Sequence, residues 1–390
     1  MRPGFSRMAG SLMDSCIMEL ISVASAPGMV SFATGLPDRD LFDPEGIAEA
    51  ASDVLSSDEA RPSLQYGDAL GFMPLREKIS RRLRREAGLS VEPERIVLTN
   101  GSQECFDLLG KLFLDPGDGL AVENPGYLGA LQSFSAYGPE YSGVDVGEGG
   151  PSMEGLRAAL SKKPKMFYCI PNHQNPTGYS YGDDARKGVA DLVDGSGMLL
   201  VEDDAYGELG HRGRAGKAIS SMVDDAVLTG SFSKVVSPGL RVGWMALPEW
   251  AVPKASAMLE ASCLQAGSFS QRVIDRFLEI RDYDAHLERQ RKAYLAKKDR
   301  FLGLLSENMP PGVEWNDPSG GMFVWLRLPE GADADALCKA ALRRKLVLMP
   351  GKPFHVRGGG NTIRLNYATP SPSETVCGME ALGLAAREIL

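Results

Sequence analysis

Between residues 95 and 247, short apolar segments alternate with amphipathic segments of helical period, and this alternation constrains the fold more than any other feature. Strands that are buried on both faces are apolar throughout, and parallel strands need helical crossovers between them. The expected strands are 95–100, 119–124, 165–170, 197–203, 226–231 and 241–247, and the expected helices lie near 103–114, 127–136 and 183–194. The pattern predicts an α/β fold with a mostly parallel sheet covered by helices on both faces.

The pattern changes after about residue 250, where the spacing indicates a mixed α+β region. Its expected elements are two long helical stretches at 251–280 and 284–307, a strand at 320–328, a helix at 333–344 and a strand at 361–368. We therefore expect a large domain at 46–280 and a small C-terminal domain at 281–390. Residues 1–45 are expected to fold back onto the small domain as an N-terminal segment.

The charge balance disfavours some classes of partner. The chain has 42 Lys and Arg against 51 Asp and Glu, a net charge of −9, whereas nucleic acids and anionic membranes are bound by clustered positive charge. The six cysteines are scattered without a CxxC pair or a nearby histidine cluster, so we expect reduced thiols and no metal site. Since the sequence has neither a secretory signal nor an apolar run of the ~18 residues that a bilayer needs, it predicts a cytoplasmic protein.

Polar residues that suit a ligand gather where the expected strands end, which is where open α/β sheets bind ligands. Gly101, Ser102 and Gln103 follow the first strand and open a helix, whose N-terminal N–H groups bind anions. A purely structural helix start is the alternative. Asn175, in "PNHQNPTG", precedes Pro176 and is biased to extended geometry that projects its amide into a cleft, although a self-bonded turn also fits.

Two further polar residues follow the strand at 197–203. Asp203 ends that strand, and Tyr206 comes three residues later. A carboxylate at this place either caps the next helix or holds a proton on a heteroaromatic nitrogen, for which a buried negative charge is suited. The tyrosine is placed to donate to a phenolate oxygen.

Lys234 lies in "SFSKVVSPGLRVGW", after Ser231 and Ser233 and before Arg241. Two hydroxyls and a guanidinium around one point match the recognition of a phosphate. Desolvation and neighbouring positive charge lower the pKa of an amine and make it nucleophilic. For this motif alone, an exposed lysine in a serine-rich loop is the alternative.

Together, the four strand ends match pyridoxal phosphate. Its aldehyde suits Lys234, and its pyridine nitrogen suits Asp203. Its phenolate oxygen suits Asn175 and Tyr206, and its phosphate suits the remaining residues. Each group alone has a structural alternative, but their order at successive strand ends favours the cofactor.

The sequence is also similar, over nearly its whole length, to the fold-type I, class I and II aminotransferases that depend on pyridoxal phosphate. It most resembles the branch with 2-aminoadipate and kynurenine aminotransferases and MocR-type regulators. The resemblance is carried by "SFATGLPDRDLF", "QYGDALGFMPLRE", "TNGSQECFDLLGKLFLDPGD", "ENPGYLGAL", "PNHQNPTG", "VEDDAY", "GSFSKVVSPGLRVGW", "PSGGMFVWLRLP" and "IRLNYA". It implies a large domain with a mostly parallel seven-stranded sheet between helices, and a smaller α+β domain.

The resemblance also implies roles for single residues. Lys234 matches the lysine that forms an imine (Schiff base) with the cofactor and shuttles a proton, and Asp203 matches the partner of the pyridine nitrogen. Asn175 and Tyr206 match the donors to the phenolate oxygen. Tyr127 of "NPGY" matches an aromatic residue that stacks on the pyridine ring, with a core tyrosine as the alternative. The residues expected around the phosphate are Gly101, Ser102, Gln103, Ser231, Ser233 and Arg241.

Three more residues match positions that complete the family's site. Tyr66 of "QYGD" matches a residue that reaches the phosphate from the neighbouring subunit, which implies a homodimer with shared sites. Arg364 of "IRLNYA" matches the arginine that binds the substrate α-carboxylate, with a surface arginine on a strand as the alternative. Gly35 matches the backbone that approaches the same carboxylate, together with Asn175.

One position departs from the family pattern. The 2-aminoadipate enzymes carry an arginine in an N-terminal helix for the distal carboxylate of their substrate, and Met18 stands at the matching place. A methionine cannot form a bidentate bond to a carboxylate, so we do not expect a dicarboxylic amino donor as the main substrate. His173 of "PNHQNPTG" either lines the pocket or is a loop histidine without a role.

The resemblance implies an aminotransferase that moves an amino group from an L-amino acid to a 2-oxo acid by a ping-pong mechanism. In it, Lys234, Asp203 and Tyr206 are the expected catalytic residues. Elimination, replacement or cyclisation with the same cofactor is the alternative, because the cofactor residues would be identical. A ligand-sensing MocR-type domain is a third interpretation, disfavoured because only about thirty residues precede "SFATGLP".

Overall fold

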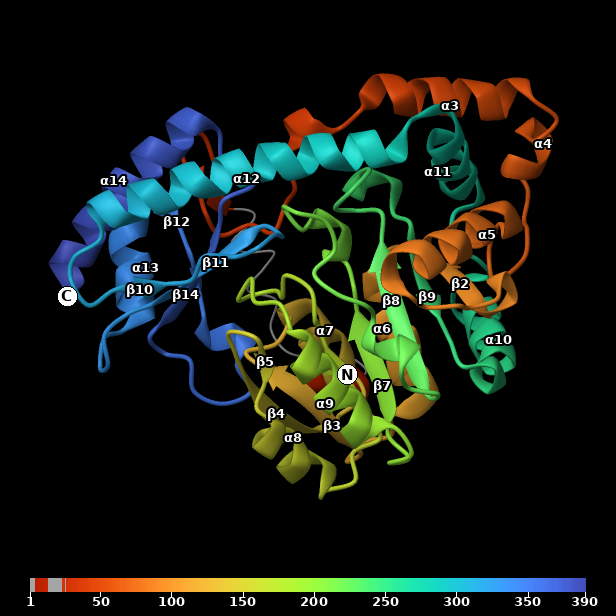
Figure 1. The fold of residues 1–390 in the computed structure, drawn as a ribbon, viewed down its shortest axis with the longest axis horizontal. Helices are drawn as coiled ribbons and strands as arrows, with labels where there is room; N and C mark the ends of the chain where they lie inside the picture. Colours follow the sequence, from red (N-terminus) through yellow and green to blue (C-terminus); the bar gives the residue numbers. More distant parts are fainter. Residues whose placement is uncertain (1–3, 13–22, 25) are drawn as a thin grey trace.

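The computed structural model describes residues 4–12, 23–24 and 26–390 and is built on two main β-sheets (Figure 1). In the described part of the chain the larger sheet has eight strands in the order β2-β9-β8-β7-β6-β3-β4-β5. Their bounds are β2 (Ile96–Thr99), β3 (Gly119–Asn124), β4 (Glu140–Gly147), β5 (Gly150–Pro151), β6 (Met166–Cys169), β7 (Leu199–Asp203), β8 (Ala226–Ser231) and β9 (Gly243–Ala246). Strands β8, β7, β6, β3 and β4 are parallel to one another, whereas β9 and β5 run antiparallel to their neighbours.

Helices cover both faces of this sheet. On one face, Val97, Val122 and Val201 pack against Phe106 and Phe134 of the covering helices. These helices are α6 (Ser102–Phe113), α7 (Leu128–Ser135) and α10 (Val252–Cys263). The opposite face packs against α5 (Met73–Arg82), the π-helical turn Leu83–Ala87, α8 (Met153–Leu160) and α9 (Asp183–Val193). Because side chains alternate along a strand, burial on both faces explains why these strands are apolar throughout.

The second sheet has four antiparallel strands in the described residues, in the order β10-β11-β14-β13. Their bounds are β10 (Glu314–Trp315), β11 (Phe323–Arg327), β13 (Met349–Pro350) and β14 (Thr362–Asn366). Three helices pack with this sheet: α12 (Tyr283–Asn308), α13 (Ala334–Arg343) and α14 (Pro372–Ile389). The long α12 runs from the larger sheet's side of the molecule to the C-terminal side (Figure 1).

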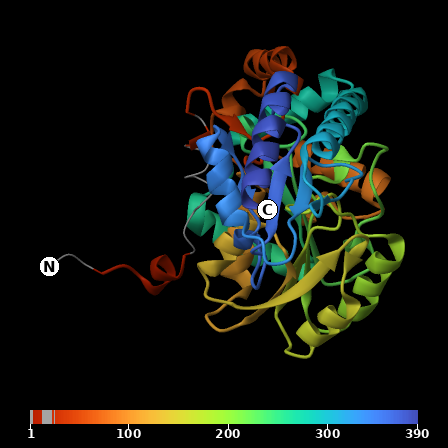
Figure 2. The same ribbon diagram turned by 90° about the vertical axis from the view of Figure 1, so that its left-hand side faces the viewer.

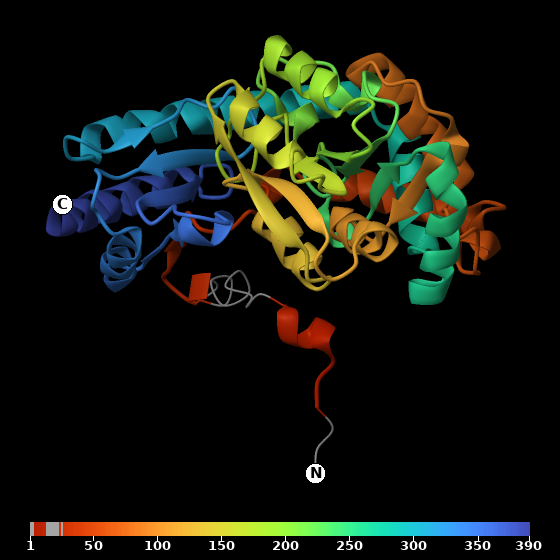
Figure 3. The ribbon, with the colours of Figure 1, turned by 90° about the horizontal axis from the view of Figure 1, so that it is seen from below.

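The N-terminal region forms a separate, short parallel ladder beside this second sheet, and the carbonyl of Phe32 accepts from the backbone N–H of Asn366 on β14. Strand β1 (Val30–Ser31) pairs with β12 (Leu346–Val347), and the ring of Phe32 lies 5.0 Å from that of Phe301 on α12. Farther upstream, the short helix α1 (Arg7–Ser11) lies away from both sheets (Figures 2 and 3). The boundaries expected at 45/46 and 280/281 stay a prediction.

Several details differ from the sequence-based expectation. The stretch 251–280 is two helices, α10 and α11 (Ser268–Ile280), because Leu264 leaves the helical region with φ 66°. The elements β4 and α8 were not predicted, because β4 is only partly buried and lacks a continuous apolar run. The expected seven strands become eight, because β5 adds a two-residue antiparallel edge to β4.

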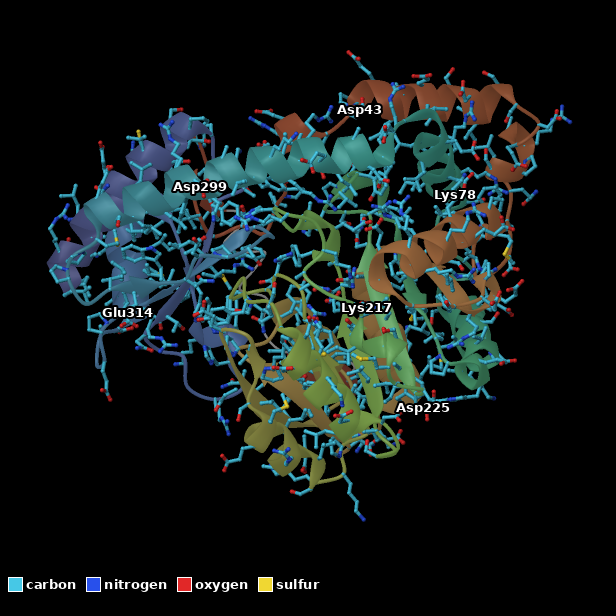
Figure 4. All side chains as sticks on the ribbon, viewed as in Figure 1. Asp43, Lys78, Lys217, Asp225, Asp299 and Glu314 are labelled. Atoms are coloured by element: carbon cyan, nitrogen blue, oxygen red, sulfur yellow. The ribbon has the colours of Figure 1, made fainter. Side chains whose placement is uncertain are left out.

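Ion pairs connect the outer helices, and Figure 4 labels two of the residues that form them, Lys78 and Asp43. Lys78 on α5 donates to Asp275 and Glu279 on α11. Asp43 caps α3 (Pro44–Ser56), which leads to the short α4 (Ala60–Ser63), and pairs with Arg281 after α11. In the part of the chain that the structure describes, no helix is both long and apolar enough to cross a bilayer.

The contact between the N-terminal segment and α14 gives a stability prediction. A Cβ at Gly378 on α14 would overlap the ring of Phe32, so Gly378→Ala is expected to destabilise the protein by about 1–3 kcal/mol through overpacking. The matched control is Gly303→Ala on α12, where no atom lies within 4 Å of the new Cβ. That control is expected to gain up to about 1 kcal/mol from helix propensity. Urea unfolding measures both, and equal stability of the two variants would contradict the packing.

Candidate active site

A cavity of about 210 Å³ lies at the carboxyl ends of the central strands. Its described lining residues are Ser102, Gln103, Tyr127, Ile170, Asn175, Asp203, Ala205, Tyr206, Ser231, Ser233, Lys234, Pro238 and Arg241. Ten of these thirteen are residues that the sequence analysis singled out. They come from the ends of β2, β3, β6, β7 and β8, which the sheet brings to one edge.

Lys234 follows β8 and turns its amine inward. Its Nζ donates to the carbonyl of Gly35 at 2.9 Å, so the N-terminal segment reaches the cavity. Desolvation lowers the pKa of Lys234 to about 8, and the charges of Arg364 and Arg241 act in the same direction. A substantial share of the amine is therefore neutral near pH 8, as a nucleophile or a proton acceptor must be.

Asp203 is the last residue of β7 and is buried. Tyr168 donates its hydroxyl to Oδ2 at 2.7 Å, and Thr229 donates to Oδ1 at 3.1 Å. Burial raises the pKa of Asp203 to about 6, while these two hydrogen bonds oppose the rise. The carboxylate is thus ionised at neutral pH and can hold a proton on a basic nitrogen in front of it.

The opposite end of the cavity is an anion site. Helix α6 begins at Ser102, and its first N–H groups have no partner within the helix. Gly101 has φ 84°, and a Cβ there would collide with the guanidinium of Arg241. Arg241 donates to Ser233 Oγ at 3.4 Å and to the carbonyl of Asn100 at 2.8 Å. A glycine is therefore required at 101 both for backbone conformation and for the approach of Arg241.

The third group joins both sheets. The Nδ2 of Asn175 donates to the hydroxyl of Tyr206 at 3.4 Å. The Oδ1 of Asn175 accepts from Nη1 of Arg364 at 2.9 Å. Arg364 on β14 also donates to the carbonyl of Ala33 and lies over the ring of Phe323, 4.4 Å from its centroid. The guanidinium is thus held by groups from three segments far apart in the sequence.

Tyr127 precedes α7 and lines the same cavity. Its ring is 6.2 Å from Phe106 in an edge-on arrangement. Burial raises the pKa of Tyr127 to about 12, so the hydroxyl stays protonated at neutral pH. The ring is available for stacking on a planar ligand, as the resemblance implied.

Three residues that the sequence analysis discussed do not contribute to this cavity in the structure or cannot be placed in it. Tyr66 is 75% exposed on the surface. His173 is buried outside the cavity lining, where its ring packs against Gly210, Gly320 and Gly321, so the expectation that it lines the pocket is not met. Met18 lies outside the described residues.

Sequence reasoning missed the residues behind the lining. Tyr168 and Thr229 contact Asp203 from neighbouring strands, and Ile170 lines the cavity. Since every residue of β6 and β7 is buried, periodicity alone could not show which face of these strands turns toward α6. Strand register supplies that information: Asp203 is paired with Thr229.

The donor set fits pyridoxal phosphate. A cationic, glycine-opened helix start suits the phosphate, Asp203 suits the pyridine nitrogen, and an amine with a lowered pKa suits the aldehyde. When bound, this cofactor supplies an electron sink for the charge that develops at the substrate α-carbon. Among the described residues, no cluster of three His, Cys, Asp or Glu is arranged for a metal ion.

Comparisons with known proteins agree with this geometry. The family model described as aminotransferase class I and II matches residues 27–382. The chain is 37% identical to a 2-aminoadipate transaminase of Thermus thermophilus, covering 99% of this chain and 97% of that one. It is 35% identical to aromatic-amino-acid aminotransferase 1 of Thermococcus litoralis, covering 95% and 91%. The crystal structure of an α-aminoadipate aminotransferase from Thermus thermophilus, complexed with N-(5'-phosphopyridoxyl)-L-leucine, matches with a TM-score of 0.92 and 36% identity over 99% and 97% of the two chains.

The chain belongs to the class I and II aminotransferase family. It is a pyridoxal-phosphate-dependent enzyme that transfers an amino group, and the family, fold type, reaction and cofactor predicted from the sequence are confirmed. Elimination and ligand sensing were the other two interpretations, and the named relatives favour neither of them over transamination.

The cationic surroundings of Lys234 give a pH prediction. In cofactor-free protein, labelling of Lys234 by an amine reagent should reach half of its maximal rate near pH 8, because only the neutral amine reacts. Arg364→Gln should move this midpoint to higher pH, since the positive charge that lowers the pKa is removed. Mass spectrometry of the labelled peptide measures the rate, with exposed lysines of the same chain as the internal reference. A midpoint that coincides with that of the exposed lysines would contradict the geometry.

Proposed function

We propose that the cavity catalyses transamination of monocarboxylic L-amino acids, with Lys234 moving the proton and Asp203 holding the charge of the cofactor nitrogen. The observation that supports this most directly is the meeting of three groups around one cavity: the amine of Lys234, the carboxylate of Asp203 and the Asn175–Arg364 pair. Transamination of an α-amino acid needs a base for the α-proton, a charge partner for the cofactor nitrogen and a cation for the α-carboxylate, and these three groups are suited to those tasks.

Lys234 is proposed as the general base and acid. Its amine is held at 2.9 Å from the carbonyl of Gly35 and has a pKa near 8, which suits taking a proton from the substrate α-carbon and returning it. Asp203 keeps a negative charge in a desolvated site, and electrostatic stabilisation is strongest there. Tyr206 and Asn175 are proposed as hydrogen-bond donors to the phenolate oxygen of the cofactor, whose negative charge they would stabilise.

Arg364 is proposed to bind the substrate α-carboxylate. Its guanidinium is buried between two aromatic rings, with Phe323 at 4.4 Å and Phe354 at 5.0 Å. Held in this way, the fork of donors presents a planar pair of N–H groups and loses little conformational entropy when a carboxylate binds. The carbonyls of Gly35 and Ala33 accept from Lys234 and Arg364, which supports an approach of the N-terminal segment to the proposed carboxylate site.

The charge of the N-terminal segment supports the donor class. Between Arg7 and Arg39 the sequence has no lysine, arginine or histidine, and it carries Asp14, Glu19 and Asp38. This segment therefore contains no cation that could pair with a distal carboxylate, and its Asp38 is already paired with Lys297. Apolar amino acids need no such cation, which is why we propose monocarboxylic donors.

A homodimer with shared sites is also proposed. Leu64, Tyr66 and Leu264 are 73%, 75% and 53% exposed, and the backbone N–H of Gly67 donates to Gln265, so these apolar side chains lie on two adjoining loops. Such a patch is suited to contact with a second copy, from which Tyr66 would reach the neighbouring phosphate site.

A cytoplasmic location is proposed as well. The cysteines that the structure describes, Cys105, Cys169, Cys263, Cys338 and Cys377, are free thiols. Free thiols are typical of reducing compartments.

Replacement of Lys234, together with a donor panel, tests the reaction. Lys234→Ala should lower kcat by at least about a hundredfold, since general acid–base catalysis contributes that much, while the control Lys254→Ala on α10 should leave it unchanged. Leucine, methionine and phenylalanine should give kcat/KM values at least about tenfold above those of 2-aminoadipate and glutamate, the equivalent of one missing charge pair. Oxo-acid formation that depends on an added 2-oxo acid is the readout. Wild-type turnover by Lys234→Ala would overturn the assigned role, and equal use of 2-aminoadipate would overturn the donor class.

Complementation between two variants tests the shared site. Co-expression of Lys234→Ala and Tyr66→Ala chains with different affinity tags yields a heterodimer. One of its sites has both changes and the other has neither, if Tyr66 acts across the interface. Such a heterodimer should recover about half of the wild-type activity per dimer, while both homodimers stay impaired. A heterodimer as impaired as its parents would show that Tyr66 serves its own subunit.

A further inference from the structure

Tyr168 lies behind the cavity lining and forms a hydrogen bond with the carboxylate of Asp203. Tyr168 on β6 is fully buried, and its hydroxyl donates to Asp203 Oδ2 at 2.7 Å. Thr229 on β8 donates to the other oxygen of Asp203 at 3.1 Å. Since β7 lies between β6 and β8 in the sheet, the carboxylate is held from both neighbouring strands.

The tyrosine ring itself has little freedom. It packs edge-on against Phe106 of α6, with centroids 5.4 Å apart, and edge-on against Phe134 of α7 at 5.9 Å. Asp203 and Thr229 are cross-strand partners in register. Two donors fixed by packing therefore act on the two oxygens of one carboxylate, and this defines its plane as well as its position.

The charges around Asp203 show why these neutral donors matter. The adjacent Asp204 is compensated by Arg214 at 2.5 Å and by Asn172 at 2.7 Å. Burial is the largest influence on the pKa of Asp203 and raises it, whereas Tyr168 and Thr229 are the main groups that lower it. The other titratable or charged groups that interact with Asp203 are Lys234, Tyr127, Tyr206, Cys105, Glu123 and Cys169.

We propose that Tyr168 is a positioning residue, whose hydroxyl keeps the Asp203 carboxylate ionised and correctly oriented toward the nitrogen of the cofactor ring. This inference rests on the role of Asp203 in the proposed function. Tyr168 does not line the cavity, so its effect on the reaction passes through Asp203.

The first test is the pH profile of Tyr168→Phe, which removes only the hydroxyl. Loss of a hydrogen bond to a charged group should raise the pKa of Asp203, so the acidic limb of the kcat profile should move about one unit toward higher pH. A pKa near 7 would leave about half of the Asp203 carboxyl ionised at pH 7, so we expect kcat there to fall about twofold, with the KM for the amino donor unchanged because Arg364 is untouched. The matched control is Tyr137→Phe: Tyr137 donates to Asp107 at 2.5 Å, the same chemical pair outside the cavity, and its loss should leave the profile in place.

The second test needs no cofactor. In the folded chain the pKa of Asp203 is about 6, above the ~3.9 of an unfolded aspartate, so its protonation favours folding at low pH and that stability is lost as pH rises through 6. Cofactor-free Asp203→Asn should therefore gain melting temperature relative to wild type as the pH rises from about 4 to about 6, and should keep that gain at higher pH. In the Tyr168→Phe background, the gain in melting temperature caused by Asp203→Asn should continue to a higher pH, because the pKa of Asp203 is expected to be higher there.

The outcomes separate the two proposals. If Asp203→Asn binds the cofactor and turns over like wild type, the role of Asp203 fails, and with it the proposed function. If Asp203→Asn is impaired but Tyr168→Phe has the pH profile of Tyr137→Phe, the positioning role of Tyr168 is overturned. Should Tyr168→Phe fail to fold, Thr229→Val removes the other side-chain donor to Asp203. An unmoved acidic limb in that variant would overturn the premise that hydrogen bonds to Asp203 set its ionisation, on which the role of Tyr168 depends.

Discussion

The electrostatic balance around Asp203 is the constraint on which the rest of the site depends. A buried carboxylate faces a cavity that also holds the amine of Lys234, with the guanidinium of Arg241 at the end where α6 begins. Desolvation lowers the pKa of Lys234, the two arginines Arg364 and Arg241 lower it further, and the carboxylate of Asp203 raises it. Because water is largely excluded, these interactions are stronger than they would be at the surface. The site is therefore tuned by the separation of its charges, which the strands fix.

That separation comes from the architecture of the larger sheet. Parallel strands end at one edge, so residues that are about thirty positions apart in the sequence become neighbours there. Asp203 and Thr229 show this directly, since they are paired across β7 and β8. The start of α6 supplies the third element at the same edge, and its N–H groups lie beside the guanidinium of Arg241, so that together they can bind an anion.

The second sheet contributes a further residue, Arg364, beside the site formed by the larger sheet. Arg364 belongs to β14, yet it bonds to Asn175 beside the larger sheet. Asn316 donates to the carbonyl of Thr177 at 2.7 Å, and Gly210 and Gly320 form a bridge between the two parts. His173 fills the space beside that bridge, which explains why its ring is buried. The proposed site for the substrate carboxylate thus depends on the contact between the two sheets.

The sequence by itself determined the α/β class, the cofactor and nine of the residues that line the cavity, because strand ends, glycines and charged residues leave local patterns, and the family resemblance added Tyr127. Lys234, Asp203 and Asn175 were identified in this way before any contact was known. The eighth strand, the break after α10 and the burial of His173 left no such pattern, since each depends on what packs nearby. Only the tertiary structure decided that Tyr168 and Thr229 hold Asp203, because a strand buried on both faces has no polarity that shows which side chains point toward a partner.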